Sequence, residues 1–396
     1  MDDDDFGLTI DTSQAPQNDS PGAAAPSQPD LSILSQGAEE QLSLHDTIAT
    51  STSSTNMFAR LVKTGRILGR GTAGVVELAV DPSTDEQFAL KTIKYDGQTN
   101  DEQKAVAREI QSISRNTFCP ILIRYYGAKS SRALGTVTLA MEYMDLGSLH
   151  SVMKLTAPLP PVVLRVVAVK MLVALAHLHS AVSTIHRDVK PKNILLSSSG
   201  ALKLADFGLA REGVSSEVDQ PSTFVGTLVY MAPETFRSQG CSSPSTDIWA
   251  LGISLCELSV GVHPMLFAAQ RKHREHELHR HIFSGKEANA QLQELGFWET
   301  YEFARKEKMT LPENNASFSE AMRNFVDAML QRDPSRRATA SQLLSHPWIL
   351  EAGEDFKFVT SDKGTVDVII SGLTATCYNQ WVEVVQRQVA NHVEHG

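Results

Sequence analysis

The chain has 396 residues, 42% of them hydrophobic and 21% charged, which is the composition of an ordinary folded protein with room for more than one core. Its four cysteines (Cys119, Cys241, Cys256, Cys377) show no CxxC or metal-ligand spacing, so we expect reduced thiols and a cytoplasmic location. The net charge of -10 comes from residues 1–57, and the 36 acidic and 36 basic residues of the remainder argue against nucleic-acid binding.

The longest apolar stretch, Val162 to Leu178, contains Arg165 and Lys170 and is short for a bilayer. Four aspartates follow Met1, where a signal peptide would have basic and apolar residues. Neither end carries a lipidation motif. We therefore expect no membrane span and no lipid anchor.

Residues 1–57 are rich in Ser, Thr, Gln, Pro, Ala and Asp and contain ten acidic residues and no Lys or Arg. Such a segment buries too little apolar area to offset the entropy of ordering, so we predict a disordered acidic arm. Leu31 to Leu44 is either part of this solvated tail or a short docking peptide. Ordered structure is predicted from Phe58.

A glycine turn follows at Gly69, Gly71 and Gly74, between two strand-like alternations. Glycines let backbone amides approach phosphates closely. A dinucleotide-binding fold would require a helix directly afterwards, but residues 75–80 alternate at the period of a strand. The next predicted strand, residues 88–94, carries Lys91, and a helix from about residue 101 to 115 carries Glu109 beside its apolar stripe.

Strands are predicted near residues 123–128 and 137–142, and an apolar helix over residues 162–179. The segment 186–196 then places Asp188, Lys190 and Asn193 before a short apolar run. An Asp and an Asn five residues apart on one loop can face a single polyphosphate, with the lysine neutralising charge on the transferred phosphate. A surface turn of common turn-forming residues is the alternative.

After a predicted strand at residues 201–205 come Asp206-Phe207-Gly208, Gly226-Thr227, Met231-Ala232-Pro233-Glu234 and Asp247-Ile248-Trp249-Ala250-Leu251-Gly252. In this order the motifs resemble those of the eukaryotic protein kinases. The resemblance implies an α+β bilobal fold with a small, mostly antiparallel β-sheet lobe that contains one key helix and a larger, mostly helical lobe. It extends over residues 58–350, with the small lobe at 58–142, the large lobe at 146–350 and an insertion at about 265–297.

The resemblance also implies roles for individual residues, with ATP and Mg²⁺ as the nucleotide and metal. Asp188 would take the substrate's hydroxyl proton, Lys190 would assist it, and Asn193 and Asp206 would hold Mg²⁺. Lys91 would bind phosphates and pair with Glu109. The nucleotide would contact Leu68, Gly69, Gly71, Gly74, Val76, Ala89, Lys91, Met141, Glu142, Met144 and Leu195.

Regulation is predicted on the polar stretch between Gly208 and Glu234. Its candidate phosphorylation sites are Ser215, Ser216, Ser222 and Thr223. Arg187 would pair with a phosphate there, and Thr227 would reach Lys190. Glu234 is expected to form a structural ion pair with Arg337.

Within the kinases, residues 140–149 and 222–234 resemble the MAP kinase kinases. A MAP kinase would then be the substrate, and an upstream kinase the activator. Two features depart from that family: the arm lacks a basic cluster, and Asp219 stands four residues before Thr223. A general Ser/Thr kinase of the same group and a pseudokinase scaffold remain as alternatives.

The insertion contains several histidines at residues 273–281, but no cysteine or carboxylate completes a tetrahedral metal set, so we predict a solvated face there. Residues 351–396 form a C-terminal tail with a predicted helix at residues 378–393. Its stripe of Trp381, Val385, Val389 and Val393 either packs on the large lobe or docks a partner.

Overall fold

The computed structural model describes residues 57–71, 74–94, 119–131, 134–206, 228–236, 243–266, 297–312, 315–360 and 366–395. All of them lie in the unit Leu42–Gly396. The predicted acidic arm up to residue 56, the helix predicted at 101–115 and most of the predicted insertion are outside the described residues.

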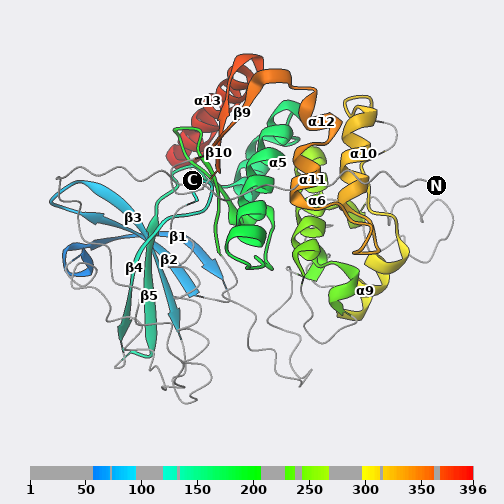
Figure 1. Cartoon of the computed structure of the whole chain (residues 1–396). Helices are drawn as coiled ribbons and strands as arrows, with labels where there is room; N and C mark the ends of the chain where they lie inside the picture. Colours follow the sequence, from blue (N-terminus) through cyan, green and yellow to red (C-terminus); the bar gives the residue numbers. More distant parts are fainter. Residues whose placement is uncertain are drawn as a thin grey trace, which may run out of the picture. The chain divides into compact units, whose positions relative to one another are not determined.

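Five antiparallel strands form the first sheet: β1 (Val62–Gly71), β2 (Gly74–Asp81), β3 (Glu86–Lys94), β4 (Tyr125–Ser131) and β5 (Thr136–Glu142). Their spatial order is β1-β2-β3-β5-β4 (Figure 1). β4 begins at Tyr125, later than predicted, because Ile121 and Ile123 are buried in the core of the helical region instead.

The helical region contains α4 (Leu149–Thr156), α5 (Pro161–Ala176), α6 (Pro244–Val260), α9 (Phe297–Lys306), α10 (Glu320–Met329), α11 (Ala340–Leu344) and α12 (Pro347–Leu350). A short π-helical turn, η2 (His177–Ala181), continues α5. α5 packs against α6 and α11, and all three contribute to one large apolar core. An antiparallel sheet beside a helical region is the α+β arrangement predicted from the sequence.

The α5–η2 segment, Pro161–Ala181, is the one helix among the described residues that is long and apolar enough to cross a membrane. Length and composition alone are weak support for a span, and 67% of its most apolar window is buried inside the protein. A run of buried valines and leucines explains this apolarity, because the helix contacts neighbouring elements on most sides.

A second sheet joins β6 (Gly147–Ser148), β7 (Ile194–Leu196) and β8 (Leu202–Leu204). The 3-10 turn η3 (Pro191–Asn193) directly precedes β7. Two further 3-10 turns, η5 (Leu228–Tyr230) and η6 (Pro233–Phe236), precede α6. Because β7 and β8 are hydrogen-bonded neighbours, the residues at their ends are held close together.

The C-terminal segment differs from the prediction. A turn, η8 (Gly353–Asp355), leads into a hairpin of β9 (Phe356–Thr360) and β10 (Val366–Ile370), which the sequence reading missed. The final helix, α13, begins at Gly372 instead of residue 378 and runs to His395. Its start is fixed by Asp355, whose Oδ2 accepts the Thr374 N–H at 3.1 Å.

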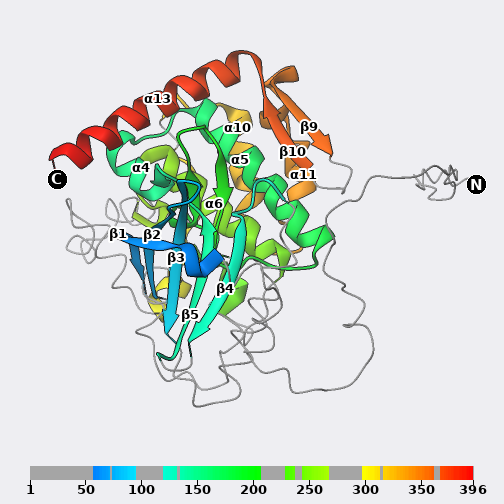
Figure 2. The same cartoon turned by 90° about the vertical axis from the view of Figure 1, so that its left-hand side faces the viewer.

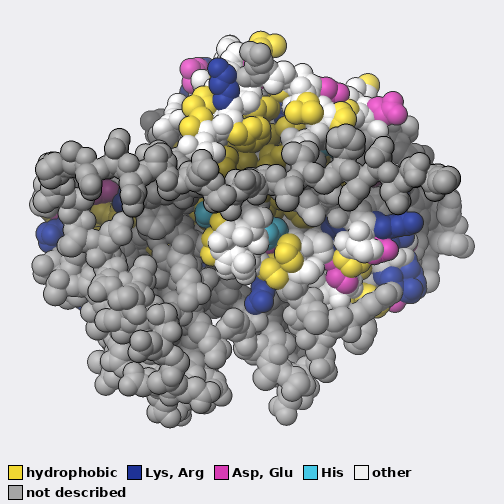
Figure 3. All heavy atoms as spheres, viewed as in Figure 1, with side chains coloured by type: hydrophobic (Ala, Val, Ile, Leu, Met, Phe, Trp, Pro, Cys, Tyr) yellow, Lys and Arg dark blue, Asp and Glu magenta, His cyan; other side chains and the backbone are white. Residues whose placement is uncertain are grey.

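α13 packs on α4 and α5, as Figure 2 shows. Trp381 and Val385 of its predicted stripe are buried there, so the interpretation of this helix as a packed element is confirmed for those residues. Its Tyr378 hydroxyl donates to the carbonyl of Gly200, in the turn between β7 and β8. Figure 3 shows apolar side chains gathered at the top of one face, where the C-terminal elements lie.

Candidate active site

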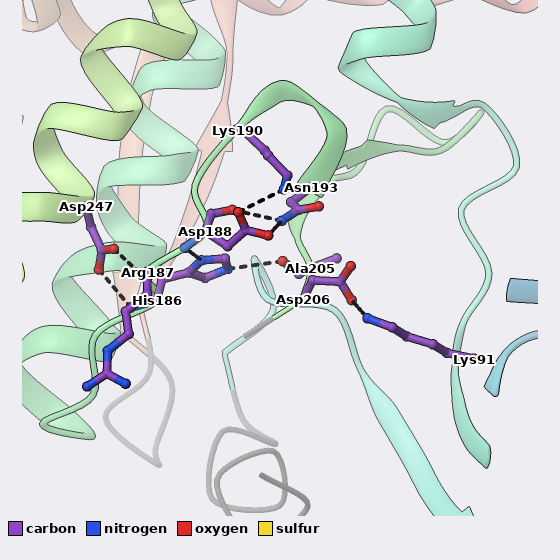
Figure 4. A network of polar contacts seen from close by, with 9 residues as sticks. All are labelled: Lys91, His186, Arg187, Asp188, Lys190, Asn193, Ala205, Asp206 and Asp247. Carbon is purple, nitrogen blue, oxygen red and sulfur yellow. Dashed lines mark hydrogen bonds and ion pairs between the residues drawn. The ribbon is translucent and has the colours of Figure 1, made fainter. Parts of the chain in front are cut away.

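Asp188 lies at the centre of a polar network formed by one loop (Figure 4). Lys190 Nζ donates to its Oδ1 at 2.8 Å, and Asn193 Nδ2 donates to its Oδ2 at 2.8 Å and to its backbone carbonyl at 2.8 Å. The 3-10 turn η3 brings Asn193 back toward Asp188. The loop therefore fixes one carboxylate between a cation and an amide, and it brings together the three residues singled out in the sequence.

The His186 side chain is fully buried and links this loop to the segment that follows β8. Its Nε2 lies 3.0 Å from the Ala205 carbonyl, and its Nδ1 accepts the Asp188 N–H at 3.2 Å. These partners fit a neutral ring with the proton on Nε2. Burial lowers the pKa of His186, which keeps that neutral form at neutral pH.

Asp247 on α6 holds the same loop through its backbone. Its Oδ2 accepts the N–H of His186 at 2.8 Å, and its Oδ1 accepts the N–H of Arg187 at 2.7 Å. His179 Nε2 is also 2.7 Å from Oδ2. Arg187 has a φ of 68°, a left-handed conformation that a non-glycine residue keeps only where its surroundings enforce it. The sequence reading noted Asp247 only as part of a motif and missed its contacts and those of His179.

Asp206 follows β8 and meets Lys91 from β3, with Lys91 Nζ 2.7 Å from its Oδ1. It too has a positive φ, 61°. The Ala205 N–H donates to the Asn193 carbonyl at 2.8 Å, which ties this segment to the loop that carries Asp188. The partner of Lys91 among the described residues is thus Asp206, whereas Glu109, its predicted partner, lies outside them.

The predicted apolar nucleotide contacts come from two places. Leu68, Val76, Ala89 and Met141 pack in one cluster of the five-stranded sheet. Met144 and Leu195 instead belong to or pack against the core of the helical region. The sheet and the helical region therefore both supply predicted contacts.

The three glycines of the predicted nucleotide contact differ in whether their positions have room for a side chain. A side chain on Gly74, which has a φ of 134°, would place its Cβ in a clash with the Thr92 carbonyl oxygen of β3. Gly69 has nothing within 4 Å of that position, and Gly71 pairs with Gly74 across β1 and β2. The packing of strands thus explains Gly74, while Gly69 leaves open space beside the backbone.

Glu142 links the sheet to the helical region. Its Oε2 accepts from Lys203 Nζ at 2.7 Å and from the Arg124 N–H at 3.2 Å. Its own backbone N–H donates to the Arg124 carbonyl at 2.8 Å, and the Met144 carbonyl accepts the Gly147 N–H at 3.1 Å. These bonds hold the segment between β5 and β6 in place.

The predicted ion pair between Glu234 and Arg337 is confirmed. Arg337 Nη1 is 2.6 Å from Glu234 Oε1 and Nη2 is 3.0 Å from Oε2, a bidentate pair. The Arg337 side chain is fully buried. It also donates to the carbonyls of Gln331 and Ser245 and lies over the Trp249 ring.

The other regulatory predictions cannot be placed. Ser215, Ser216, Ser222, Thr223 and Thr227 lie outside the described residues, as does Asp219. Arg187 is described, and its Nε is buried with no hydrogen-bond partner in the part of the chain that the structure describes. A buried guanidinium nitrogen without a partner is costly, so this residue suits an incoming anion.

The carboxylate oxygens of Asp206 and the amide oxygen of Asn193 are suitable ligands for a magnesium ion. Mg²⁺ prefers oxygen ligands and is commonly held by one or two carboxylates together with phosphates. Both hydrogen bonds of the Asn193 side chain use Nδ2, which leaves the role of a ligand to its Oδ1. Within the described ranges no group of three or more His, Cys, Asp or Glu forms a complete cage. The site thus suits an ion shared with a phosphate ligand.

Comparison with known proteins gives the family. The family model described as "Protein kinase domain" matches residues 62–349. The chain belongs to the protein kinase family.

Comparison with individual relatives shows which type of protein kinase this chain resembles. This kinase is 35% identical over 291 residues to "Mitogen-activated protein kinase kinase 5" of Leishmania mexicana, covering 72% of this chain and 49% of that protein. It is 33% identical over 296 residues to "Dual specificity mitogen-activated protein kinase kinase dSOR1" of Drosophila melanogaster, covering 72% and 69%. For "Mitogen-activated protein kinase kinase 9" of Arabidopsis thaliana the identity is 34% over 291 residues, covering 72% and 83%.

The chain is therefore a protein kinase of the MAP kinase kinase type. It spans about half the length of the Leishmania relative. The network around Asp188 and the Lys91–Asp206 pair lie inside the matched residues.

Proposed function

We propose that this kinase transfers the γ-phosphate of ATP to a Ser or Thr side chain of a protein substrate. The observation that carries the proposal is the single network in which Lys91 pairs with Asp206 while Lys190 and Asn193 orient Asp188. Each of these groups has chemistry that phosphoryl transfer needs: a base, phosphate-binding cations and oxygen ligands for a metal.

In this mechanism the chain's own residues position the reactants and move one proton. Asp188, held by Lys190 and Asn193, accepts the proton of the attacking hydroxyl. The substrate oxygen forms a bond to the γ-phosphorus while the bond from that phosphorus to the leaving oxygen of ADP breaks. Lys190 offsets the negative charge of the transferred group. Mg²⁺, held by Asp206 and Asn193, would neutralise phosphate charge when bound.

The nucleotide would contact the apolar residues that pack with Met141 and the backbone that follows β5. The carbonyl of Met144 and the N–H of Glu142 already have partners. The N–H of Met144 is therefore the natural donor to an adenine ring. Lys91 would bind the phosphates on the other side of the site.

A MAP kinase is the substrate favoured by the names of the relatives. The name of the Drosophila protein includes "dual specificity", which favours phosphorylation of both Thr and Tyr. Activation would follow phosphorylation of the stretch between Gly208 and Glu234 by an upstream kinase, with Arg187 as the receiving cation. Because Asp219 already supplies one negative charge, we expect Thr223 to be the main site and Ser215, Ser216 and Ser222 to add less.

The test of catalysis is phosphate transfer from labelled ATP in magnesium after treatment with an upstream kinase. Lys91→Met and Asp206→Asn are each expected to lower the turnover by orders of magnitude while leaving the thermal unfolding curve in place. Lys94→Met is the matched control, because Lys94 is exposed at the end of the same strand. Turnover by Lys91→Met equal to that of an active wild type would refute the role of Lys91, whereas absence of turnover in the activated wild type would favour a scaffold role.

The test of regulation and substrate uses a MAP kinase with Thr-x-Tyr in its activation loop. Thr223→Ala is expected to lose most of the activity gained on treatment with the upstream kinase. Full activation of this variant would place the switch at another residue. Phosphorylation of a generic substrate but not of the MAP kinase would favour the alternative of a general Ser/Thr kinase.

A further inference from the structure

The C-terminal hairpin exposes one edge of its sheet. β9 and β10 form a two-stranded sheet, and β10 is the strand that contacts α5 (Figure 2). Among the described residues, β10 is therefore the single strand beside β9. The pairing of the two strands has no bulge, and the five residues of β9 include no proline. Bulges and prolines commonly keep an edge strand from pairing with another chain, and β9 has neither.

The hydrogen-bond pattern of the hairpin decides which backbone groups of β9 point outward. Directly opposite residues in an antiparallel pair alternate between exchanging hydrogen bonds and directing their backbone groups away from each other. The Ser371 N–H donates to the Asp355 carbonyl at 2.8 Å, one step beyond the last pair of the hairpin. Since this is a hydrogen-bonded pair, the backbone groups of Phe356, Phe358 and Thr360 are directed away from β10.

The backbone of Val368 agrees with this alternation. Val368 lies opposite Phe358. Its N–H donates to Oδ1 of the neighbouring Asp367 at 2.7 Å, and its carbonyl lies 3.5 Å from Lys170 Nζ of α5. Both groups thus have partners other than β9. Side chains cover this outer edge of β10, whereas the outer edge of β9 presents the free backbone groups of a strand.

The side chains of β9 are exposed on both faces of the sheet. Phe358 is 47% exposed on one face, and Val359 is 44% exposed on the other. Ile369 of β10 lies on the face of Val359 and is 51% exposed. Apolar side chains on an open strand edge are typical of a surface that pairs with another strand.

Two opposite charges lie on the face that carries Val359. Lys357 is on β9 and Asp367 is on β10. They share this face because Lys357 is opposite Ile369, two residues from Asp367. Neither side chain has an ion pair within the described part of the chain. Both charges are therefore free to pair across an interface.

We propose that β9 pairs in antiparallel fashion with β9 of a second copy of this chain, about a two-fold axis at Phe358. This register places Phe358 opposite Phe358 of the partner subunit, and Phe356 opposite Thr360 of the partner subunit. The residues whose backbone groups point outward then exchange hydrogen bonds with one another. An axis at Lys357 would instead place two lysines directly opposite each other, which is unfavourable.

The same register is complementary in charge. Lys357 lies opposite Val359 of the partner subunit, and Asp367 of the partner subunit is next in that row. Neighbouring strands are about 4.8 Å apart, so the lysine side chain has to span a Cα separation of about 10 Å, together with the aspartate. The two-fold axis repeats this contact, so each copy supplies one cation and one anion. This self-complementarity favours a second copy over an unrelated peptide.

Sedimentation equilibrium of the full chain over a range of concentrations tests the dimer. Paired strands of five residues bury less than the roughly 1,200 Å² of a stable interface, so we expect a weak dimer with a Kd of roughly 1–100 µM. Phe358→Pro removes an outward N–H and leaves the hydrogen bonds to β10 in place, so this variant should be monomeric. Val384→Ala removes a similarly exposed side chain from α13 and should dimerise as wild type does. Thermal unfolding curves check that the variants fold.

Charge reversal tests the register. Lys357→Asp and Asp367→Lys each place like charges in one row, so each variant alone should dimerise about tenfold more weakly than wild type. In an equimolar mixture, the heterodimer regains opposite charges in both rows, and its Kd should return to that of wild type. A contact within one copy would not be restored by mixing. Arg387→Asp makes the same type of charge change on α13 and should leave the Kd unchanged.

Three results would overturn the proposal. A wild type that remains monomeric at about 1 mM would leave β9 to an extended segment of another protein. A dimer that persists in folded Phe358→Pro would use another surface. A mixture that dimerises no better than its two components would contradict the register about Phe358.

Discussion

Replacing Asp247 by alanine tests whether α6 holds the loop in its reactive conformation. Three donors would lose their acceptor: the N–H groups of His186 and Arg187, and Nε2 of His179. Asp247 is 1% exposed, so these groups would remain away from bulk water.

The magnitude follows from the three bonds. A hydrogen bond to a charged acceptor contributes roughly 1.5–3 kcal/mol, and loss of one buried charged partner typically costs about 3–5 kcal/mol after relaxation. Arg187, freed from Asp247, would leave its left-handed conformation, and this recovers roughly 1–3 kcal/mol of strain. Taking the middle of each range, we expect a net destabilisation of about 2 kcal/mol and a larger proportional loss of activity, because relaxation of Arg187 moves Asp188.

Urea unfolding and phosphate transfer from labelled ATP measure the two effects. Glu383→Ala is the control, since Glu383 forms an exposed pair with Arg387 on α13 and its loss should cost about 1 kcal/mol or less without changing turnover. Asp247→Asn should fall between Asp247→Ala and wild type, because one oxygen remains. If Asp247→Ala unfolded within about 0.5 kcal/mol of wild type and kept full turnover, the loop would not depend on this carboxylate.

Two further predictions concern the same helical region. Arg337→Ala should lower the free energy of unfolding by about 3–5 kcal/mol, because it leaves the Glu234 carboxylate without its bidentate partner. Arg337→Lys should recover only part of that free energy. A loss below about 1 kcal/mol for Arg337→Ala, measured by urea unfolding, would contradict the prediction. Glu257 has its pKa raised by burial from 4.5 to about 7, so its contribution to stability is complete below pH 4.5 and is lost as the pH rises through 7. The loss from this group is on the order of 3 kcal/mol. Glu257→Gln should therefore flatten the plot of unfolding temperature against pH between these two pH values. Equal slopes in the variant and the wild type would refute the assignment.

The local sequence was sufficient for much of the site. Asp188, Lys190 and Asn193 are five residues apart or fewer, and the 3-10 turn that folds them together is formed by the same segment. The alternating pattern of residues 75–80 likewise predicted β2, and residues 88–94 were predicted as the strand that follows it, which is β3. Four consecutive residues of β3 are buried, so the burial of this strand does not alternate.

The partners of those residues were decided by tertiary packing. Lys91 and Asp206 are 115 positions apart, and the sequence motifs indicated both residues but not their contact. Asp247 is 61 positions from His186, and its carboxylate meets the loop only because α6 is buried beside α5. The β9–β10 hairpin and the early start of α13 were missed for a similar reason: Val368, Tyr378 and Trp381 become core residues only through contact with the rest of the helical region.

The sequence by itself therefore determined the chemistry within each short segment. Side chains that are close in the sequence lie close together there, whatever the fold of the rest of the chain. The tertiary structure decided which distant group each charge faces. A buried carboxylate such as Asp247 can orient backbone N–H groups strongly because water is excluded around it. That exclusion is produced by the packing of whole helices, and no local pattern of residues specifies it.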